Sequence, residues 1–325
     1  AWKLAQRPRI SSVSSTSRTA GESSLTGRRF VEHLFAYSRD ALPEDFVVIE
    51  IMPAQRKHAT SAYDMTLHMD WTNAVFNDCI YMIGGVNAND RPTSLVDIMK
   101  PLTRSFVKAP SMKQARFKAA AATKDTQILV FGGFCHQKAL SSCERFDILA
   151  NRWTRLPDMP TSRFDSAAIN IPNVGIVVVG GRQTGDYTLD TAELLTGSEE
   201  DDEYWAWRGL TPMLERRVAP GVAYYHDRVF VAGGAGFPSI SVECFHLHPD
   251  GNDAGQWTQI RGPLMGQSLV VFNDKLLLAD EDGEVHEYSS ASVSKDYSKN
   301  VGMWRPLFTL REIESPILFV LRKDL

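Results

Sequence analysis

A glycine doublet recurs four times in this chain at near-constant spacing, each time directly after a short apolar run. The first glycines of successive doublets are 48, 48 and 53 residues apart. A period of this size is typical of solenoids and propellers, in which each unit buries its apolar surface against its neighbours. The spacing therefore constrains the fold more strongly than the function. The doublets are Gly84-Gly85, Gly132-Gly133, Gly180-Gly181 and Gly233-Gly234.

Further landmarks follow each doublet in a fixed order. An acid stands 10 to 13 residues after the first glycine, and a large aromatic residue comes next. An arginine follows the first three of these aromatics by ten residues. Because all three landmarks recur at one repeat position, we expect them to support the fold and not to act as catalytic groups. They are the acids Asp97, Glu144, Glu193 and Glu243, the aromatics Phe106, Trp153, Trp207 and Trp257, and the arginines Arg116, Arg163 and Arg217.

Each unit is expected to form four short strands. The first follows the arginine, the second ends at the doublet, the third carries the acid and the fourth carries the aromatic residue. Four strands in about 45 residues, with turn residues between them, indicate a propeller blade. The second strand is almost entirely apolar, which favours burial on both faces. Glycines at its end suit a place where two backbones approach closely.

The order of these landmarks resembles the kelch repeat, from residue 46 to about residue 321. The resemblance implies an all-β, six-bladed kelch β-propeller with five full blades plus an incomplete sixth blade shared by the two chain ends. Residues 46–52 would supply the outer strand of that sixth blade, and residues 316–321 would supply an inner strand. The fifth unit departs from the pattern, because Ala279-Asp280 replaces its glycine doublet.

Three segments are expected along the chain. Residues 1–27 are rich in serine and predict a disordered basic tail. Residues 28–45 have apolar residues at i, i+4 spacing and predict a short amphipathic helix and linker, which would either pack on the propeller edge or be the remnant of an upstream helical domain. Residues 46–325 form the propeller, with residues 59–71 as an extended loop. Because the sequence begins with Ala1, we expect it to be a fragment of a longer protein.

Composition narrows the class of protein. Residues 1–29 carry about +5 of charge and the whole chain carries −4, so the propeller is acidic, which argues against a nucleic-acid surface. No apolar stretch approaches the roughly 18–20 residues of a membrane span. The four cysteines are scattered and include no C-x-x-C pair, as is usual for a cytoplasmic protein.

Catalytic and metal chemistry find little support in the sequence. His246 and His248 would share one strand face, a pair that a metal could use, but no third ligand is evident nearby. We find no nucleophile triad, phosphate-binding loop or dinucleotide signature. The sequence therefore predicts no catalytic residues, no metal and no cofactor.

The resemblance also implies where a partner binds. In kelch proteins that bind peptides, pocket residues follow the glycine doublet or lie two residues after the arginine. Arg182 and Lys118 could hold a carboxylate, Phe134 could supply an aromatic anchor, and Asp165 would oppose an acidic ligand. Transferred by position, the candidates are Val86, Asn87, Phe134, Arg182 and Ala235 after the doublets, and Lys118, Asp165 and Ala219 after the arginines.

The expected function is a non-catalytic protein–protein interaction module that binds a protein or peptide at the propeller mouth. The resemblance further implies substrate recognition for a cullin-3 ubiquitin ligase, through an upstream BTB domain that this sequence does not contain. One alternative is a stand-alone cytoskeletal or actin-associated scaffold, and another is a sugar-directed propeller enzyme. An enzyme would show clustered polar groups of perturbed pKa in the channel mouth.

Overall fold

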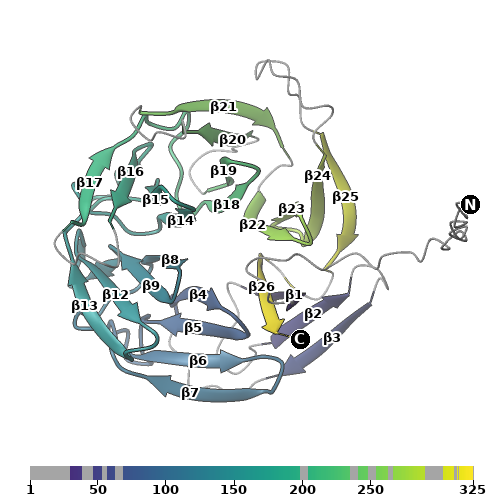
Figure 1. The fold of residues 1–325 in the computed structure, drawn as a ribbon, viewed down its shortest axis with the longest axis horizontal. Helices are drawn as coiled ribbons and strands as arrows, with labels where there is room; N and C mark the ends of the chain where they lie inside the picture. Colours follow the sequence, from purple (N-terminus) through teal and green to yellow (C-terminus); the bar gives the residue numbers. More distant parts are fainter. Residues whose placement is uncertain are drawn as a thin grey trace, which may run out of the picture.

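The computed structural model describes residues 30–38, 47–52, 57–62, 69–197, 204–234, 241–247, 254–262, 266–289, 303–310, 313 and 315–324. Six four-stranded antiparallel sheets stand around one axis as the blades of a propeller (Figure 1). The predicted all-β class and the predicted six blades are thus confirmed. The described ranges contain no helix that could cross a membrane. The tail expected over residues 1–27 lies outside them.

The strands nearest the axis and their neighbours follow the predicted order within the repeat. The innermost strands are β4 (Thr72–Phe76), β8 (Ala120–Lys124), β14 (Ala167–Ile171), β18 (Gly221–Tyr225), β22 (Gly266–Phe272) and β26 (Pro316–Asp324). The second strands are β5 (Cys79–Ile83), β9 (Gln127–Phe131), β15 (Gly175–Val179), β19 (Arg228–Ala232), β23 (Lys275–Asp280) and β1 (Phe30–Ser38).

The outer half of each blade carries the acid and the aromatic residue. The third strands are β6 (Val96–Lys100), β12 (Cys143–Asp147), β16 (Ala192–Thr196), β20 (Ser241–His246), β24 (Glu284–Ser289) and β2 (Val47–Met52). The outermost strands are β7 (Ser105–Ala109), β13 (Arg152–Leu156), β17 (Ala206–Gly209), β21 (Gln256–Arg261), β25 (Met303–Thr309) and β3 (Lys57–Ala62). A small hairpin of β10 (Phe134–Cys135) and β11 (Lys138–Ala139) follows the second doublet.

The glycine doublets lie where neighbouring blades meet. Gly84 and Gly132 have φ of +68° and +60°, values that disfavour any residue with a Cβ. A Cβ at Gly84 would overlap the carbonyl oxygen of Arg116, which belongs to the next repeat. At Gly132 it would overlap the carbonyl of Arg163 in the same way. Close packing of adjacent blades therefore requires glycine at these positions.

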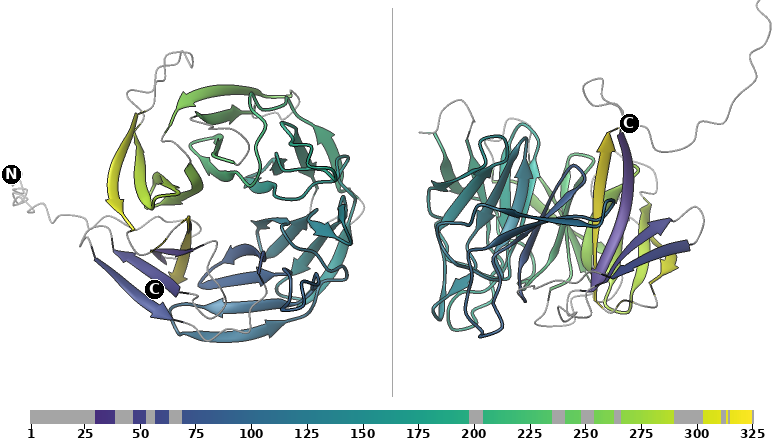
Figure 2. Two further views of the ribbon diagram at one scale, coloured as in Figure 1. Left: turned by 180° about the vertical axis from the view of Figure 1, so that it is seen from behind. Right: turned by 90° about the horizontal axis from the view of Figure 1, so that it is seen from below.

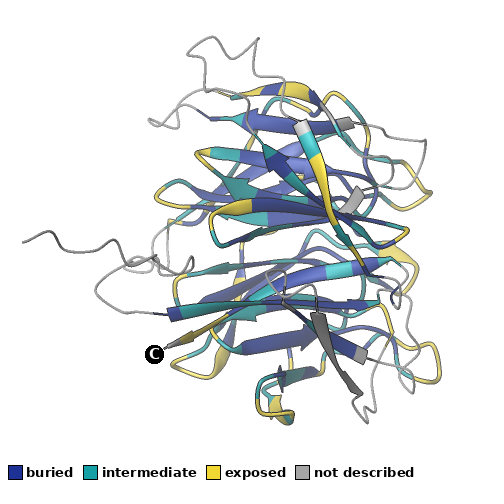
Figure 3. Ribbon diagram, turned by 90° about the vertical axis from the view of Figure 1, so that its right-hand side faces the viewer, coloured by how far each residue is buried: buried dark blue, intermediate teal, exposed yellow. Residues whose placement is uncertain are grey.

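The core lies between the blades, where the second strands β5, β9 and β15 are buried along their whole length, whereas the outermost strands β7 and β17 have no buried residue (Figure 3). One cluster joins Val177 and Leu194 of the third full blade to Val229 and Phe245 of the fourth. The tryptophans of the repeat also connect each blade to the one before it, through their indole N–H groups. These donate to the preceding interblade turn, from Trp153 to Pro110 O (2.7 Å), from Trp207 to Pro157 O (2.9 Å) and from Trp257 to Thr211 O (2.8 Å).

The two chain ends close the ring in one blade, as predicted, but that blade is complete. Strand β26 pairs with β1 along nine residues, and the two lie side by side in the right-hand view of Figure 2. The order β26-β1-β2-β3 gives four strands. The prediction of an incomplete sixth blade was therefore wrong. The outer strand is β3, so Val47–Met52 lies third and residues 57–62 are not part of a loop.

The amphipathic helix predicted over residues 28–45 was also wrong, because Phe30–Ser38 is strand β1. Its alternate side chains face two different neighbours. Leu34 and Ala36 pack in the cluster shared with the fifth blade, whereas Phe35 and Tyr37 pack with the first full blade. A strand buried on both faces reads as a continuous apolar run, which spacing alone does not separate from a helix.

Candidate partner-binding site

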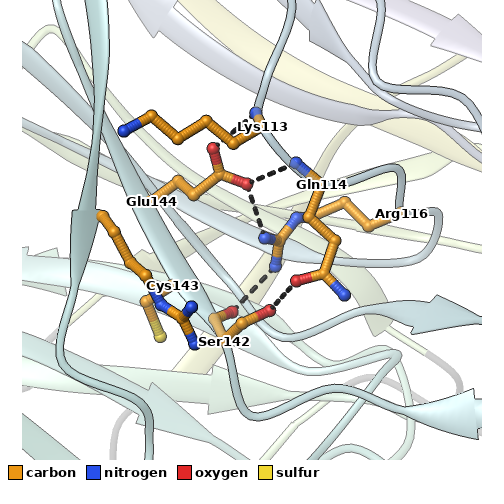
Figure 4. A pocket seen from close by; sticks show the side chains of 7 residues that line it. Lys113, Gln114, Arg116, Ser142, Cys143 and Glu144 are labelled. Carbon is orange, nitrogen blue, oxygen red and sulfur yellow. Dashed lines mark hydrogen bonds and ion pairs between the residues drawn. The ribbon is translucent and has the colours of Figure 1, made fainter.

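Buried arginines connect the loop before the first strand of a blade to the second and third strands of that blade. The Arg116 guanidinium donates to Gly132 O at 2.7 Å. It also donates to Ser142 O (2.8 Å) and to the Glu144 carboxylate (2.8 Å), as Figure 4 shows. Its own carbonyl accepts from Gly85 N of the preceding blade at 2.9 Å. One residue thereby joins two blades, through its backbone on one side and its side chain on the other.

The same clamp is repeated in the next two blades. Arg163 donates to Gly180 O at 3.0 Å and lies 3.0 Å from Glu193. Arg217 donates to Gly233 O at 2.8 Å and lies 2.9 Å from Glu243. Burial lowers the pKa of Arg163, and the adjacent Glu193 carboxylate opposes that shift. The structural role predicted for the repeated arginines is confirmed.

Two of the third-strand acids, Glu144 and Glu243, also hold the loop that precedes the arginine of their blade. Glu144 accepts backbone N–H bonds from Lys113 (2.7 Å) and Gln114 (3.1 Å). Glu243 accepts from Leu214 and Glu215 in the same manner. The structural role predicted for these acids is confirmed too. For Asp97 of the first full blade this role stays a prediction. Residue 68, which stands two residues before Asp70 as Arg116 stands before Lys118, lies outside the described residues.

A cavity of about 330 Å³ lies beside the first clamp, and Figure 4 shows the side chains that line it. Cys143 lines this cavity, but its thiol is not a nucleophile at neutral pH, because burial raises its pKa to about 12. The polar groups here bond to one another, with Ser142 donating to the Gln114 side chain at 2.6 Å. The cavity therefore belongs to the clamp.

The mouth of the propeller is organised by a chain of backbone hydrogen bonds that runs from blade to blade. Lys118 N donates to Asp70 O (3.1 Å), Asp165 N to Lys118 O (2.9 Å), and Ala219 N to Asp165 O (2.6 Å). All four residues have φ between 51° and 54°. The left-handed backbone is thus the shared feature of the position two residues after the arginine.

A second cavity of about 460 Å³ opens at this mouth, a size that suits a ligand or an inserted side chain. Four of the predicted site residues line it together, namely Lys118, Asp165, Arg182 and Ala219. The inner strands β4, β8, β14 and β18 form its wall, mostly with small side chains. The repeat thus brings residues far apart in sequence to one surface.

The charges at the mouth are paired with one another. Arg182 lies 2.6 Å from Asp165 and 3.2 Å from Asp186, and its guanidinium stacks 4.9 Å from the Phe164 ring. Lys118 lies 3.6 Å from Asp70. The cations predicted to hold a ligand carboxylate are therefore already engaged by carboxylates of the protein. A partner would have to displace these carboxylates or present charges complementary to both the cations and the acids.

Of the other predicted residues, Phe134 and Val86 do not line the cavity. Phe134 packs between Phe117 (5.6 Å) and Phe164 (4.7 Å) and is half-buried. Val86 is buried and bridges Met69 and Pro92.

Two further candidates remain, Asn87 and Ala235, and Asn87 does not line the cavity. The Asn87 side-chain oxygen accepts the backbone N–H bonds of Asn89 and Arg91, so it shapes its own turn. Ala235 lies outside the described residues.

An aromatic pair at the mouth was missed in the sequence. Tyr37 and Trp71 both line the cavity, and their rings stack at 5.1 Å with an interplanar angle of 27°. Tyr37 was hidden in the segment expected to be a helix, and Trp71 in the segment expected to be a loop. Asp70 could have been found, because it occupies the repeat position of Lys118 and Asp165. Met69 and Tyr187 are exposed side chains of nearby loops.

The ring of clamped four-stranded blades defines a six-bladed propeller with a polar and aromatic mouth. The family model of the Kelch motif matches residues 115–160, which contain the clamp of the second full blade. The similarity to the solved structure titled "Structure of YjhT" supports the fold alone, with a TM-score of 0.63, 16% identity, and coverage of 80% of this chain and 90% of that one.

Curated proteins with similar sequences carry the same repeat in their names. Kelch repeat protein M-T8 of Myxoma virus (strain Lausanne) is 28% identical over 158 residues, 48% of this chain and 30% of that protein. Kelch-like protein 35 of Mus musculus is 26% identical over 224 residues, 66% of this chain and 36% of that protein. The matched region spans about a third of each relative. Together with the six blades, these similarities support the predicted resemblance to kelch-repeat propellers.

Proposed function

We propose that the chain is a protein-interaction module that holds a peptide or loop of a partner in the mouth cavity. The observation that carries this proposal is the convergence of an aromatic pair and two ion pairs on one cavity of about 460 Å³. Loops presented by a rigid scaffold commonly carry binding residues. The similarity to kelch-repeat proteins supports the same role.

The cavity contents suggest how a partner is held. Trp71 is half-buried and stacks on the buried Tyr37, so it offers an aromatic surface, and large aromatic side chains dominate the energetics of protein interfaces. The pairs Lys118–Asp70 and Arg182–Asp165 offer both signs of charge around it. A segment with one apolar or aromatic side chain flanked by polar residues fits this arrangement best.

The test is a selection from a displayed peptide library against the purified chain, followed by affinity measurements on the selected peptides. We expect Trp71→Ala and Arg182→Ala to weaken binding at least tenfold, in the range of interface anchors. Arg155→Ala is the matched control, because this arginine is exposed and paired with Asp158 on an outer strand, away from the mouth cavity. Selected peptides that bind all three variants and the wild type equally would reject the mouth as the site.

For the wider role, we propose that this propeller recognises substrates for a cullin-3 ubiquitin ligase. The support is the similarity to Kelch-like protein 35 and to Kelch-like protein 23 of Homo sapiens, the latter 23% identical over 159 residues and 48% of this chain. The test is co-precipitation of cullin-3 with the full-length gene product and cullin-3-dependent ubiquitination of the bound partner. A full-length product that lacks a BTB domain and does not bind cullin-3 would reject this role. The cytoplasmic location and the absence of catalysis stay predictions, which cell fractionation and activity screening test.

A further inference from the structure

The fifth full blade replaces both ends of the clamp. Ala279 pairs with Val285 as Phe131 pairs with Cys143, so Asp280 stands at the position of the first glycine. By the same register, His286 stands at the position of the third-strand acid. The sequence from 262 to 304 contains no arginine. A carboxylate and an imidazole thus occupy positions that a glycine and an acid occupy elsewhere.

A third ligand-type side chain joins these two. Asp280 and His286 are buried, and Glu284 is 45% exposed. The Nε2 atom of His286 lies 3.3 Å from Asp280 Oδ2 and 3.4 Å from Glu284 Oε2. One ligand atom from each of the three residues lies within 4.8 Å of the other two. The spacing Asp-x-x-x-Glu-x-His brings all three to one tight turn.

The distances in the cluster fit a shared cation, and the surface pair His226–Asp274 has the same 3.3 Å length without a third ligand beside it among the described residues. Ligand atoms around a tetrahedral Zn²⁺ with bonds of about 2.0–2.2 Å are separated by roughly 3.3–3.5 Å. His286 stands at that separation from both carboxylates.

The ligand types of the cluster suit a cation. The buried Asp280 carboxylate lies beside an imidazole, whereas the buried acid of each clamp lies beside an arginine. A buried carboxylate needs a partner of opposite charge. A divalent cation bound to two carboxylates and a neutral imidazole would balance the charge.

The ligand turn is braced before any ion binds. Asp280 Oδ1 accepts the backbone N–H of Glu284 at 2.8 Å, which leaves Oδ2 facing His286. Gly283 has φ of +81°, and its carbonyl accepts from Leu310 N at 2.8 Å. Ser315 N donates to Glu281 O at 3.0 Å, directly before β26. The turn is thereby fastened to the chain segment that closes the ring.

We propose that Asp280, Glu284 and His286 bind a divalent cation of the Zn²⁺ class and that this ion stabilises the junction of the fifth blade with the closing blade. One nitrogen and two oxygen ligands form a set that Zn²⁺ accepts, with a fourth position open to water. Glu284 is the most exposed of the three side chains, so ion binding would restrict its motion the most. The site is structural, since it takes the place of an arginine clamp.

The experiment is calorimetric titration of the chelator-stripped full chain with Zn²⁺, combined with thermal unfolding and Co²⁺ absorption. We expect one saturable site per chain, a rise in Tm on Zn²⁺ addition, and visible Co²⁺ bands of a low-coordinate site. Glu284→Gln should weaken Zn²⁺ binding by at least about 10-fold, as supporting groups of metal sites already do. Its metal-free Tm should match the wild type, because the side chain is half-exposed.

His226→Asn is the matched control, since it removes a surface His–Asp pair of 3.3 Å that has no third ligand among the described residues. It should leave Zn²⁺ affinity unchanged. The proposal is overturned by the absence of saturable Zn²⁺ binding, or by equal affinity in the wild type and in Glu284→Gln. Binding of Mg²⁺ in preference to Zn²⁺ would overturn the assigned class. A second variant is His286→Asn, which removes the nitrogen ligand. If it does not fold, the Zn²⁺ affinity of Glu284→Gln decides the test on its own.

Discussion

The clamp of the fourth full blade offers the sharpest test of how this propeller is held together. Arg217 and Glu243 are both 0% exposed and lie 2.9 Å apart. Replacing Arg217 with methionine keeps much of the side-chain volume and removes the charge. The Glu243 carboxylate then keeps its two backbone donors, Leu214 N and Glu215 N, and loses the guanidinium. Gly233 O loses its side-chain donor.

The magnitude follows from the burial of both partners. Removing one member of a buried ion pair costs about 3–5 kcal/mol, chiefly because a charge stays buried without its partner. With a urea m value of about 3 kcal/mol/M, Arg217→Met should lower the unfolding midpoint by roughly 1–1.7 M. The total stability of a domain is about 5–15 kcal/mol, so the loss is a large fraction of it.

Urea unfolding followed by tryptophan fluorescence and circular dichroism measures the effect, with an unchanged m value as the condition for comparing midpoints. Arg155→Met is the control, because the exposed Arg155–Asp158 pair should contribute about 0–1 kcal/mol. Adding Glu243→Gln to Arg217→Met should restore part of the stability. The amide oxygen still accepts from Leu214 N, while the unpaired charge is gone.

Two results would refute this reasoning. One is a free energy of unfolding for Arg217→Met within about 1 kcal/mol of the wild type, since a fully buried pair cannot be so weakly coupled to the fold. The other is further destabilisation on adding Glu243→Gln, because the cost would then not come from the unpaired carboxylate.

Three other predictions follow from the same structure. Gly132→Ala should lower stability by at least about 2 kcal/mol in urea unfolding, because its Cβ would overlap the Arg163 carbonyl at a positive φ, whereas Gly209→Ala, with nothing within 4 Å, should change it little. Burial raises the pKa of Cys79 to about 11 and of Cys143 to about 12, so the folded state keeps thiol protons that the unfolded state loses above about pH 9. The free energy of unfolding should therefore fall as the pH rises from 9 to 12. The same two thiols should resist alkylation at pH 8 in the native protein. Truncation before Pro316 removes β26 and should yield a chain that self-associates in sedimentation, because β1 would become an open edge; a monomer with the full-length Tm would contradict this.

Much of the fold could be predicted because its packing rules act on single residue types. Glycine is required where Gly84 meets the Arg116 carbonyl, and arginine is required to reach the glycine carbonyl and the acid together. These requirements recur in the second, third and fourth full blades, so the sequence repeats them there. Strand β1 lacks both signals. No glycine doublet directly follows it, since Arg39 and Asp40 come after Ser38, and its apolar run serves two interblade clusters at once.

The mouth could be predicted as a set of positions but not as a set of contacts. The left-handed backbone of Lys118, Asp165 and Ala219 is a property of the repeat, and position alone identified it. The pairing of Arg182 with Asp165 depends on how one blade sits against the next, which spacing does not report. The Tyr37–Trp71 stack joins the closing blade to the first full blade, so it depends on a closure that was itself only partly predicted.

The most direct test of the central claim is hydrogen exchange of the chain with and without a bound partner segment. The account predicts that protection appears around the mouth, in residues 69–71, 117–119, 164–166 and 182–188, where the interblade backbone chain and the cavity lie. Protection confined to the hairpin turns of the opposite face, such as Asp125–Thr126 and Asn273–Asp274, or to the outermost strands, would contradict it.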